Sequence, residues 1–154
     1  MKLVLLNSQL LLFLTLLHIP SFLCFTYTHS QAMNLLQNEG ISISSTGRCS
    51  NRNNPQCTSL EGIHSEAIDG IITLKKASGC PIIITGGTET GHSSVGARSH
   101  HNGWKIDIRK RGNDCTTRYI TNTFPKISNN RWRAASGNVY LNEHNHWDIQ
   151  YGNN

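Results

Sequence analysis

Beyond its first two dozen residues, the sequence has little leucine or phenylalanine and no second long apolar run. The scarcity of these residues leaves little material for long amphipathic helices, which argues against a helical bundle. The lack of a second apolar run excludes a protein that crosses a membrane several times. Internal repeats and low-complexity tracts are also absent. Gly, Ser, Thr and Asn are abundant instead, and this composition favours a loop-rich domain of mixed α and β structure.

The N-terminal residues have the pattern of a secretory signal peptide. Lys2 supplies an early positive charge, and the mostly apolar run Leu3–Leu17 follows it and ends before Pro20. The run is shorter than the roughly 20 residues that a membrane-spanning helix needs. A cleaved signal therefore fits this segment better than an uncleaved membrane anchor, and we predict a secreted, extracellular protein.

The position of signal cleavage has two candidates. Ser30 and Ala32 fit a small-x-small cleavage site, and cleavage just after Cys24 is the alternative. We predict a signal peptide at residues 1–30 and a single domain at 31–154. About 120 residues are enough for one modest hydrophobic core.

Cysteine usage agrees with secretion. Of five cysteines, Cys24 is expected to leave with the signal, so an even set of four remains. Four cysteines allow three pairings. We favour Cys49–Cys57 and Cys80–Cys115, because the first two lie eight residues apart in a polar turn segment. A four-cysteine zinc site is the competing interpretation, but the sequence has no C-x-x-C pair.

The hydrophobic pattern predicts an α+β fold. Thr58 and Glu61 have the spacing of a capping box, and apolar residues then recur at helical intervals until Gly79. Short strands are expected at 41–44, 81–85, 104–108, 131–135, 138–141 and 146–151, with a helix or strand at 118–124. We therefore predict a small, mostly antiparallel sheet with one or two packed helices.

Histidines gather at two places, and the first includes a carboxylate. His100 and His101 end a polar loop, Gly103 permits a tight turn, and Asp107 follows on the polar face of the next predicted strand. A turn of this kind can bring the imidazole of His100 and the carboxylate of Asp107 to one metal ion. We interpret His101, and likewise His144 in the second cluster, as exposed neighbours or as groups that support a ligand.

The second cluster is Glu143, His144 and His146, at the start of the last predicted strand. Together, His100, Asp107 and His146 would form a three-ligand zinc site with a fourth position open for water. A nearby Glu that does not bind the metal can take a proton from that water, which zinc acidifies. Ordinary hydrogen-bonded histidines are the alternative interpretation of these residues.

The two clusters resemble the motifs of a known enzyme family. H-x-x-G-x-x-x-D at His100, Gly103 and Asp107, followed by E-x-x-H-W at Glu143 and His146, is similar to the zinc D-alanyl-D-alanine peptidases. These peptidases share a fold with the hedgehog signalling domain. The resemblance spans roughly residues 82–149. It implies one zinc ion held by His100, Asp107 and His146, with Glu143 as the catalytic base.

The sequence departs from this family at two positions. The family has an Arg shortly after a strand, where it steadies the substrate or the oxyanion, and Glu89 stands at that place. The family's Ser two places before the first ligand is replaced by Arg98. Arg98 or His92 could supply the missing electrostatic clamp. Otherwise, hydrolytic power is low or lost.

The resemblance implies a secreted zinc metallopeptidase that acts on peptidoglycan stem peptides or another cell-wall polymer. After loss of Lys2 the charge would be +4, from 13 basic and 9 acidic residues, and a basic protein suits an anionic wall. We expect a monomer that does not associate with membranes after signal cleavage. The alternative is a catalytically weak or inactive wall- or glycan-binding protein on the same scaffold.

A small secreted ribonuclease is a third hypothesis from a different class. The basic charge, two predicted disulfides and several His and Glu residues motivate it, since His and Glu can cleave RNA without a metal. It leaves the spacing of His100, Asp107 and His146 unexplained. Nucleic acid is therefore the least favoured partner.

Overall fold

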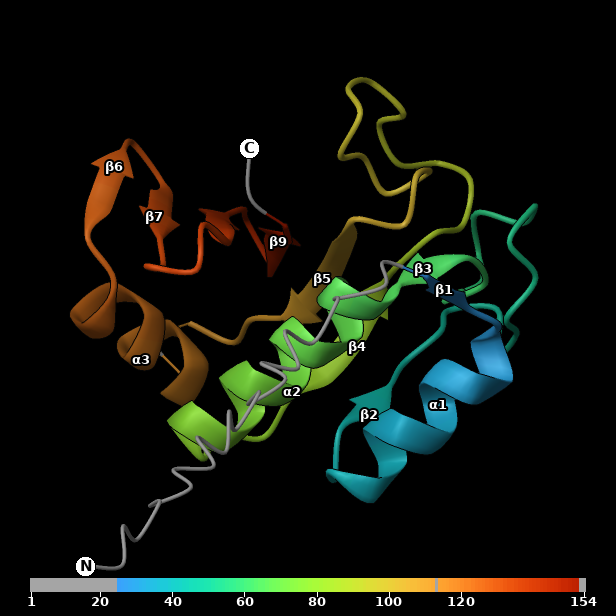
Figure 1. The fold of residues 1–154 in the computed structure, drawn as a ribbon, viewed down its shortest axis with the longest axis horizontal. Coiled ribbons are helices and arrows are strands. Elements are labelled where there is room, and N and C mark those ends of the chain that lie inside the picture. The colour runs from blue at the N-terminus through green and yellow to red at the C-terminus, as the bar shows by residue number, and fades with distance from the viewer. Residues whose placement is uncertain (1–24, 113, 153–154) are drawn as a thin grey trace, which may run out of the picture.

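The computed structural model describes residues 25–112 and 114–152, and the predicted signal run at 3–17 lies outside them. Figure 1 shows the arrangement of the elements. Three helices are present in this part of the chain: α1 (His29–Asn38), α2 (Ser65–Ser78) and α3 (Cys115–Thr123). The strands are β1 (Thr26–Tyr27), β2 (Ser42–Ile43), β3 (Ile63–His64), β4 (Ile83–Gly86), β5 (Lys105–Arg109), β6 (Lys126–Ser128), β7 (Arg131–Arg133), β8 (Val139–Asn142) and β9 (His146–Gln150).

The main sheet has the strand order β2-β4-β5-β9-β8-β7-β6. Its pairs are antiparallel except for β2 with β4, which run parallel. A separate two-stranded sheet joins β1 to β3. The predicted α+β class with a mostly antiparallel sheet is confirmed, although three helices pack with it rather than one or two.

The two faces of the main sheet have different chemistry. Ile106, Ile108, Trp147 and Ile149 point from β5 and β9 into the buried core, which α2 covers with residues such as Ile71. Figure 1 shows α2 lying across β4 and β5. Because strand side chains alternate, the other face of β5 and β9 carries polar residues: Lys105, Asp107, Arg109, His146 and Asp148.

The helix predicted from the capping box begins later than expected. Thr58 does not cap it, since its hydroxyl donates to the carbonyls of Ser44 and Thr85. The helix α2 starts at Ser65 after His64, and its end before the left-handed Gly79 was predicted correctly. Residues around Leu60 are buried in the preceding turn, so their apolar character reflects core packing rather than helix.

Two elements of the fold begin before the predicted cleavage site. β1 pairs with β3, and Thr28 caps α1 through a capping box with Gln31. Ala32, one of the two small residues of the predicted cleavage site, is fully buried. Cleavage after Cys24 would leave β1 and α1 whole.

The two favoured disulfides are both formed. Cys49 joins Cys57, and Cys80 joins Cys115. The second bond links the chain after α2 to the first residue of α3. Each bridge that closes a loop restricts the unfolded chain and stabilises the fold by about 2–4 kcal/mol.

No helix among the described residues is long and apolar enough to cross a membrane.

Candidate metal centre

Asp107 occupies the middle of β5, in the interior of the main sheet. In the strand register it lies opposite Gly86 of β4 on one side and Asp148 of β9 on the other. The loop that joins β4 to β5 carries His92 and His100, and β9 begins with His146. Strand pairing and one loop therefore bring three imidazoles to a single carboxylate.

The donor atoms around Asp107 are close together. His100 Nε2 lies 3.3 Å from Asp107 Oδ1, and His92 Nδ1 lies 3.5 Å from Asp107 Oδ2. The Nε2 atom of His146 lies 3.8 Å from the same Oδ2. In a tetrahedral zinc site with bonds of about 2.0–2.1 Å, neighbouring ligand atoms are about 3.3–3.5 Å apart. The spacing of His92, His100 and Asp107 therefore suits one small cation, whereas His146 contacts Asp107 but lies outside this closely spaced group.

Each imidazole is oriented through its other ring nitrogen. His100 Nδ1 donates to the carbonyl of Gly87 over 2.7 Å, and His146 Nδ1 lies 2.9 Å from the side-chain oxygen of Asn145. His92 Nε2 lies 2.9 Å from Glu89 Oε1. Such contacts are typical of metal-binding histidines, because they hold the ring and turn the second nitrogen toward the metal. In His146 that second nitrogen also contacts Glu143 Oε2, at 3.0 Å.

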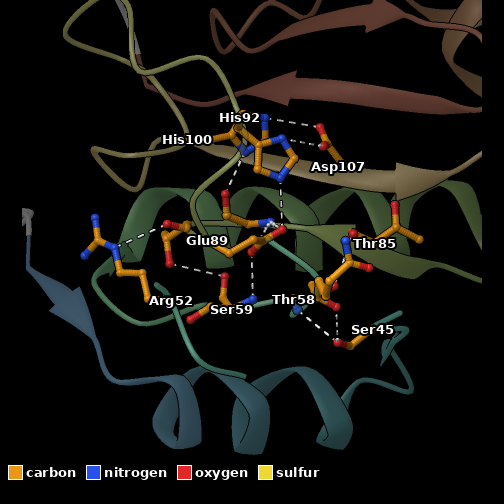
Figure 2. A network of polar contacts seen from close by, with 12 residues as sticks. Ser45, Arg52, Thr58, Ser59, Thr85, Glu89, His92, His100 and Asp107 are labelled. Atoms are coloured by element: carbon orange, nitrogen blue, oxygen red, sulfur yellow. Dashed lines mark hydrogen bonds and ion pairs between the residues drawn. The ribbon is translucent and has the colours of Figure 1, made fainter. Parts of the chain in front are cut away.

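Glu89 supports the loop from a buried position (Figure 2). Its carboxylate accepts backbone N–H bonds from Ser59 at 2.7 Å and from Gly87, besides the contact with His92. Burial alone would raise the pKa of Glu89, but these hydrogen bonds hold it below its ordinary value. The same carboxylate raises the pKa of His92, against the effect of burial.

Arg52 fixes the same loop from the outside. Its guanidinium donates to the carbonyls of Thr88 and His101, and Figure 2 shows it beside the Glu89 network. The carbonyl of Gly87, on which His100 depends, is thus held in a segment tied down from two directions. The imidazoles are consequently preorganised by a hydrogen-bonded loop rather than by packing alone.

The carboxylates of Asp107 and Asp148 lie directly opposite each other on β5 and β9. Both are buried, and the Oδ1 atom of each has no hydrogen-bond partner among the described residues. Like charges paired across strands destabilise a sheet, and Lys105 neutralises only Asp148, at 2.7 Å from Oδ2. Burial alone would raise the pKa of Asp107, but the surrounding imidazoles lower it overall. This arrangement fits a bound cation.

Gly86 leaves room for that cation. A Cβ added at Gly86 would lie 2.5 Å from Asp107 Oδ2 and 3.0 Å from Cε1 of His92. Its backbone is not in the left-handed region, so the absence of a side chain here serves space rather than conformation. The residues present therefore fit a metal ion in donor chemistry, donor spacing and volume.

The structure brings together most of the residues predicted from the sequence. His92, His100 and Asp107 have ligand atoms that all lie within 4.8 Å of one another. His146 adjoins this group through Asp107, and Glu143 Oε2 lies 3.0 Å from His146 Nε2. Three imidazoles, rather than two, consequently surround the carboxylate.

The position of Arg98 differs from that of a clamp at this cluster. Its guanidinium donates to the carbonyl of Gly152 over 3.1 Å and lies over the ring of Trp104. Arg98 does not line either of the two pockets that open on the metal cluster, which are described below. Of the two clamp candidates from the sequence, only His92 reaches the cluster. His101 and His144 are exposed, as predicted.

The sequence does not reveal the supporting roles of Glu89 and Gly86. Glu89 was interpreted only as a departure from the family, although its spacing three residues before His92 allows the observed pairing. Gly86 gave no signal, because the space beside Asp107 depends on strand register.

Two pockets open on the cluster and share His92, Asp107 and His146. The Glu143 pocket, of about 270 Å³, is further lined by Gly91, Ser93, His100, Lys105, Glu143 and Asp148. The Arg109 pocket, of about 420 Å³, is further lined by Ser44, Thr46, Thr85, Arg109 and Asn145. His100 and Asp107 are buried, whereas Glu143 is 42% exposed. The cluster is thus reached by solvent from two sides.

Replacement of Glu89 by Gln is expected to weaken metal binding by about 10- to 100-fold, the usual effect of losing an outer contact that supports a metal-binding histidine. The neutral amide accepts fewer of the loop's N–H bonds, and this loosens Gly87, whose carbonyl orients His100. Zinc affinity would be measured by competition with a chromophoric chelator. Glu39→Gln, at the distant end of α1, is the control. Unchanged affinity in the Glu89 variant would show that the Glu89 network does not support the metal site.

Comparison of the chain with protein-family models, with curated proteins and with solved structures finds no match.

Proposed function

We propose that the protein is a secreted, zinc-dependent hydrolase that cleaves peptide bonds in peptidoglycan stem peptides. The observation that carries the proposal is the convergence of His100, His146 and His92 on the buried carboxylate of Asp107. The motif resemblance favours His100, Asp107 and His146 as the residues that would hold the ion, and His92, His100 and Asp107 are the three whose ligand atoms all lie within 4.8 Å of one another. Zinc suits these ligands, since imidazole and carboxylate bind it well.

A bound zinc ion would supply a Lewis acid that polarises the scissile carbonyl and acidifies a water molecule. Glu143 would receive the proton, and two observations support this role: its carboxylate lies 3.0 Å from Nε2 of His146, and it lines the same pocket. Its exposure would let it turn from that water molecule toward the leaving amine, to which it would return the proton. The sequence match E-x-x-H-W supports this role for Glu143.

His92 is suited to steady the negative charge that develops on the substrate oxygen. Glu89 keeps its pKa raised, which favours the cationic imidazole, and the ring stacks on His100 with centroids 4.2 Å apart. Donors held in place before the reaction stabilise such charge without reorganisation. In this assignment, His92 would take over the role of the arginine that the family has at the position of Glu89.

Supply of the protein to intact bacterial peptidoglycan tests the proposal. The expected result is release of peptide fragments, detected by mass spectrometry, that stops after chelation and returns on addition of zinc. Activity that persists after full chelation would refute the zinc mechanism. Cleavage of RNA that persists in the presence of a chelator would favour the ribonuclease hypothesis.

A second function is favoured by one observation, the closeness of His92 to the cluster. If His92 Nδ1 also binds the ion, four protein donors close a tetrahedral site, as in structural zinc centres. The protein would then be a wall- or glycan-binding protein on the same scaffold. It would contain zinc and bind peptidoglycan saturably without cleaving it.

A further inference from the structure

The Arg109 pocket has a character opposite to that of the Glu143 pocket, although the two share His92, Asp107 and His146. Beyond the shared residues, the Arg109 pocket has no carboxylate, and its lining side chains are hydroxyls, an amide and one guanidinium. The Glu143 pocket carries two further carboxylates and a lysine that is already paired with one of them. Charge is therefore distributed asymmetrically across the cluster.

The guanidinium of Arg109 is held in place at the edge of its pocket. Arg109 lies directly opposite His146 in the β5–β9 register, so it stands next to the metal cluster. Its Nη2 donates to Ser44 Oγ over 2.8 Å. An arginine has five N–H donors in a rigid fork that matches a carboxylate. In the described part of the chain, this bond to Ser44 is the one that the fork makes, so other donors can reach a ligand.

We propose that Arg109, positioned by Ser44, is a carboxylate-recognition residue. It determines on which side of the scissile bond the carboxylate of the substrate must lie. The inference rests on the proposed function and deepens it. A substrate carboxylate would pair with Arg109, while the uncharged or amine-bearing part would lie toward Glu143 and Asp148. The hydroxyls of Thr46 and Thr85 could take the remaining acceptor positions of that carboxylate.

The carboxylate could be the C-terminus of a peptide or an acidic side chain within it. Ser44 also lines a third pocket, of about 500 Å³, together with Arg48 and Cys49. Because the two pockets meet at Ser44, a peptide that continues beyond the recognised carboxylate could reach the third pocket. The chemistry is the same in both cases, so the test must separate them.

The test measures binding in the Glu143→Gln variant, so that turnover does not interfere, with and without added zinc. The probes are N-acetyl-D-alanyl-D-alanine, its C-terminal amide, and N-acetyl-alanyl-glutamyl-alanine amide, titrated by NMR. We expect the first or third probe to bind at least tenfold more tightly than the neutral amide. Adding Arg109→Gln should remove that preference, a loss of roughly tenfold or more for a charge-assisted pair.

Two further variants keep the result interpretable. Ser44→Ala should give a smaller loss, because it frees the guanidinium without removing it. Arg131→Gln, which removes an exposed charge on β7, should bind all probes as the parent does. The inference fails if Arg109→Gln retains the carboxylate preference, or if the parent binds the amide as well as the acids. Because the readout is binding, these outcomes are distinct from a failure to hydrolyse peptidoglycan.

Discussion

Replacement of Asp107 by Asn is expected to abolish stoichiometric zinc binding. Asp107 is the one carboxylate that all three imidazoles face, at 3.3, 3.5 and 3.8 Å. Because even a residue that only orients a ligand contributes 10- to 100-fold to affinity, loss of the shared carboxylate should exceed about 100-fold. The measurement is metal content by mass spectrometry of the purified protein, followed by competition with a chelator.

The metal-free form of this variant should remain folded. Asp107 and Asp148 repel each other across β5 and β9 when no cation is bound, and the amide removes that repulsion. The parent should gain about 2.7 kcal/mol of stability from zinc at a hundred times its dissociation constant, whereas the variant should gain none. Asp69→Asn on α2 is the control for loss of a carboxylate elsewhere. Equal zinc content in parent and Asp107 variant would refute the metal site.

Replacement of Glu143 by Gln is expected to reduce peptide release from peptidoglycan by about 100- to 10,000-fold, the usual contribution of a general base. Zinc content should not change, because the ligands His100, Asp107 and His146 are intact. Substrate binding should persist as well, so the loss falls on kcat rather than on KM. The measurement is the initial rate of fragment release at several substrate concentrations.

His144→Gln is a matched control, since His144 is an exposed neighbour of Glu143 in the same turn. Its rate should equal that of the parent. A Glu143 variant that cleaves at the parent rate would refute the assignment of the base. A parent that holds zinc but releases nothing would favour the binding protein with four donors, including His92.

The sequence predicts the residues of the site better than it predicts their relations. The pairing of His100 with Asp107 follows from a short loop and one strand, and both disulfides follow from spacing and context. The approach of His146 required β9 to pair with β5, a long-range contact that local pattern does not specify. The motif resemblance supplied this relation in place of periodicity.

Other features depend on tertiary contacts that no local signal records. The start of α2 was placed too early because apolar Leu60 and Ile63 continue the helical spacing, although they pack from a turn and a short strand. The buried position of Glu89 depends on the backbone of Ser59, thirty residues away. Short strands such as β1 and β6 are defined by their partners rather than by their own composition.

The separation of the main sheet into an apolar face under α2 and a polar face at the cluster has a practical consequence. Side chains such as Asp107 and His146 can be changed without opening the packing of Ile106 or Trp147, which point the other way. Variants inactivated at these positions should therefore keep the fold and the pockets around the cluster. Immobilised on a support, such forms could retain natural wall fragments long enough for their chemical identification.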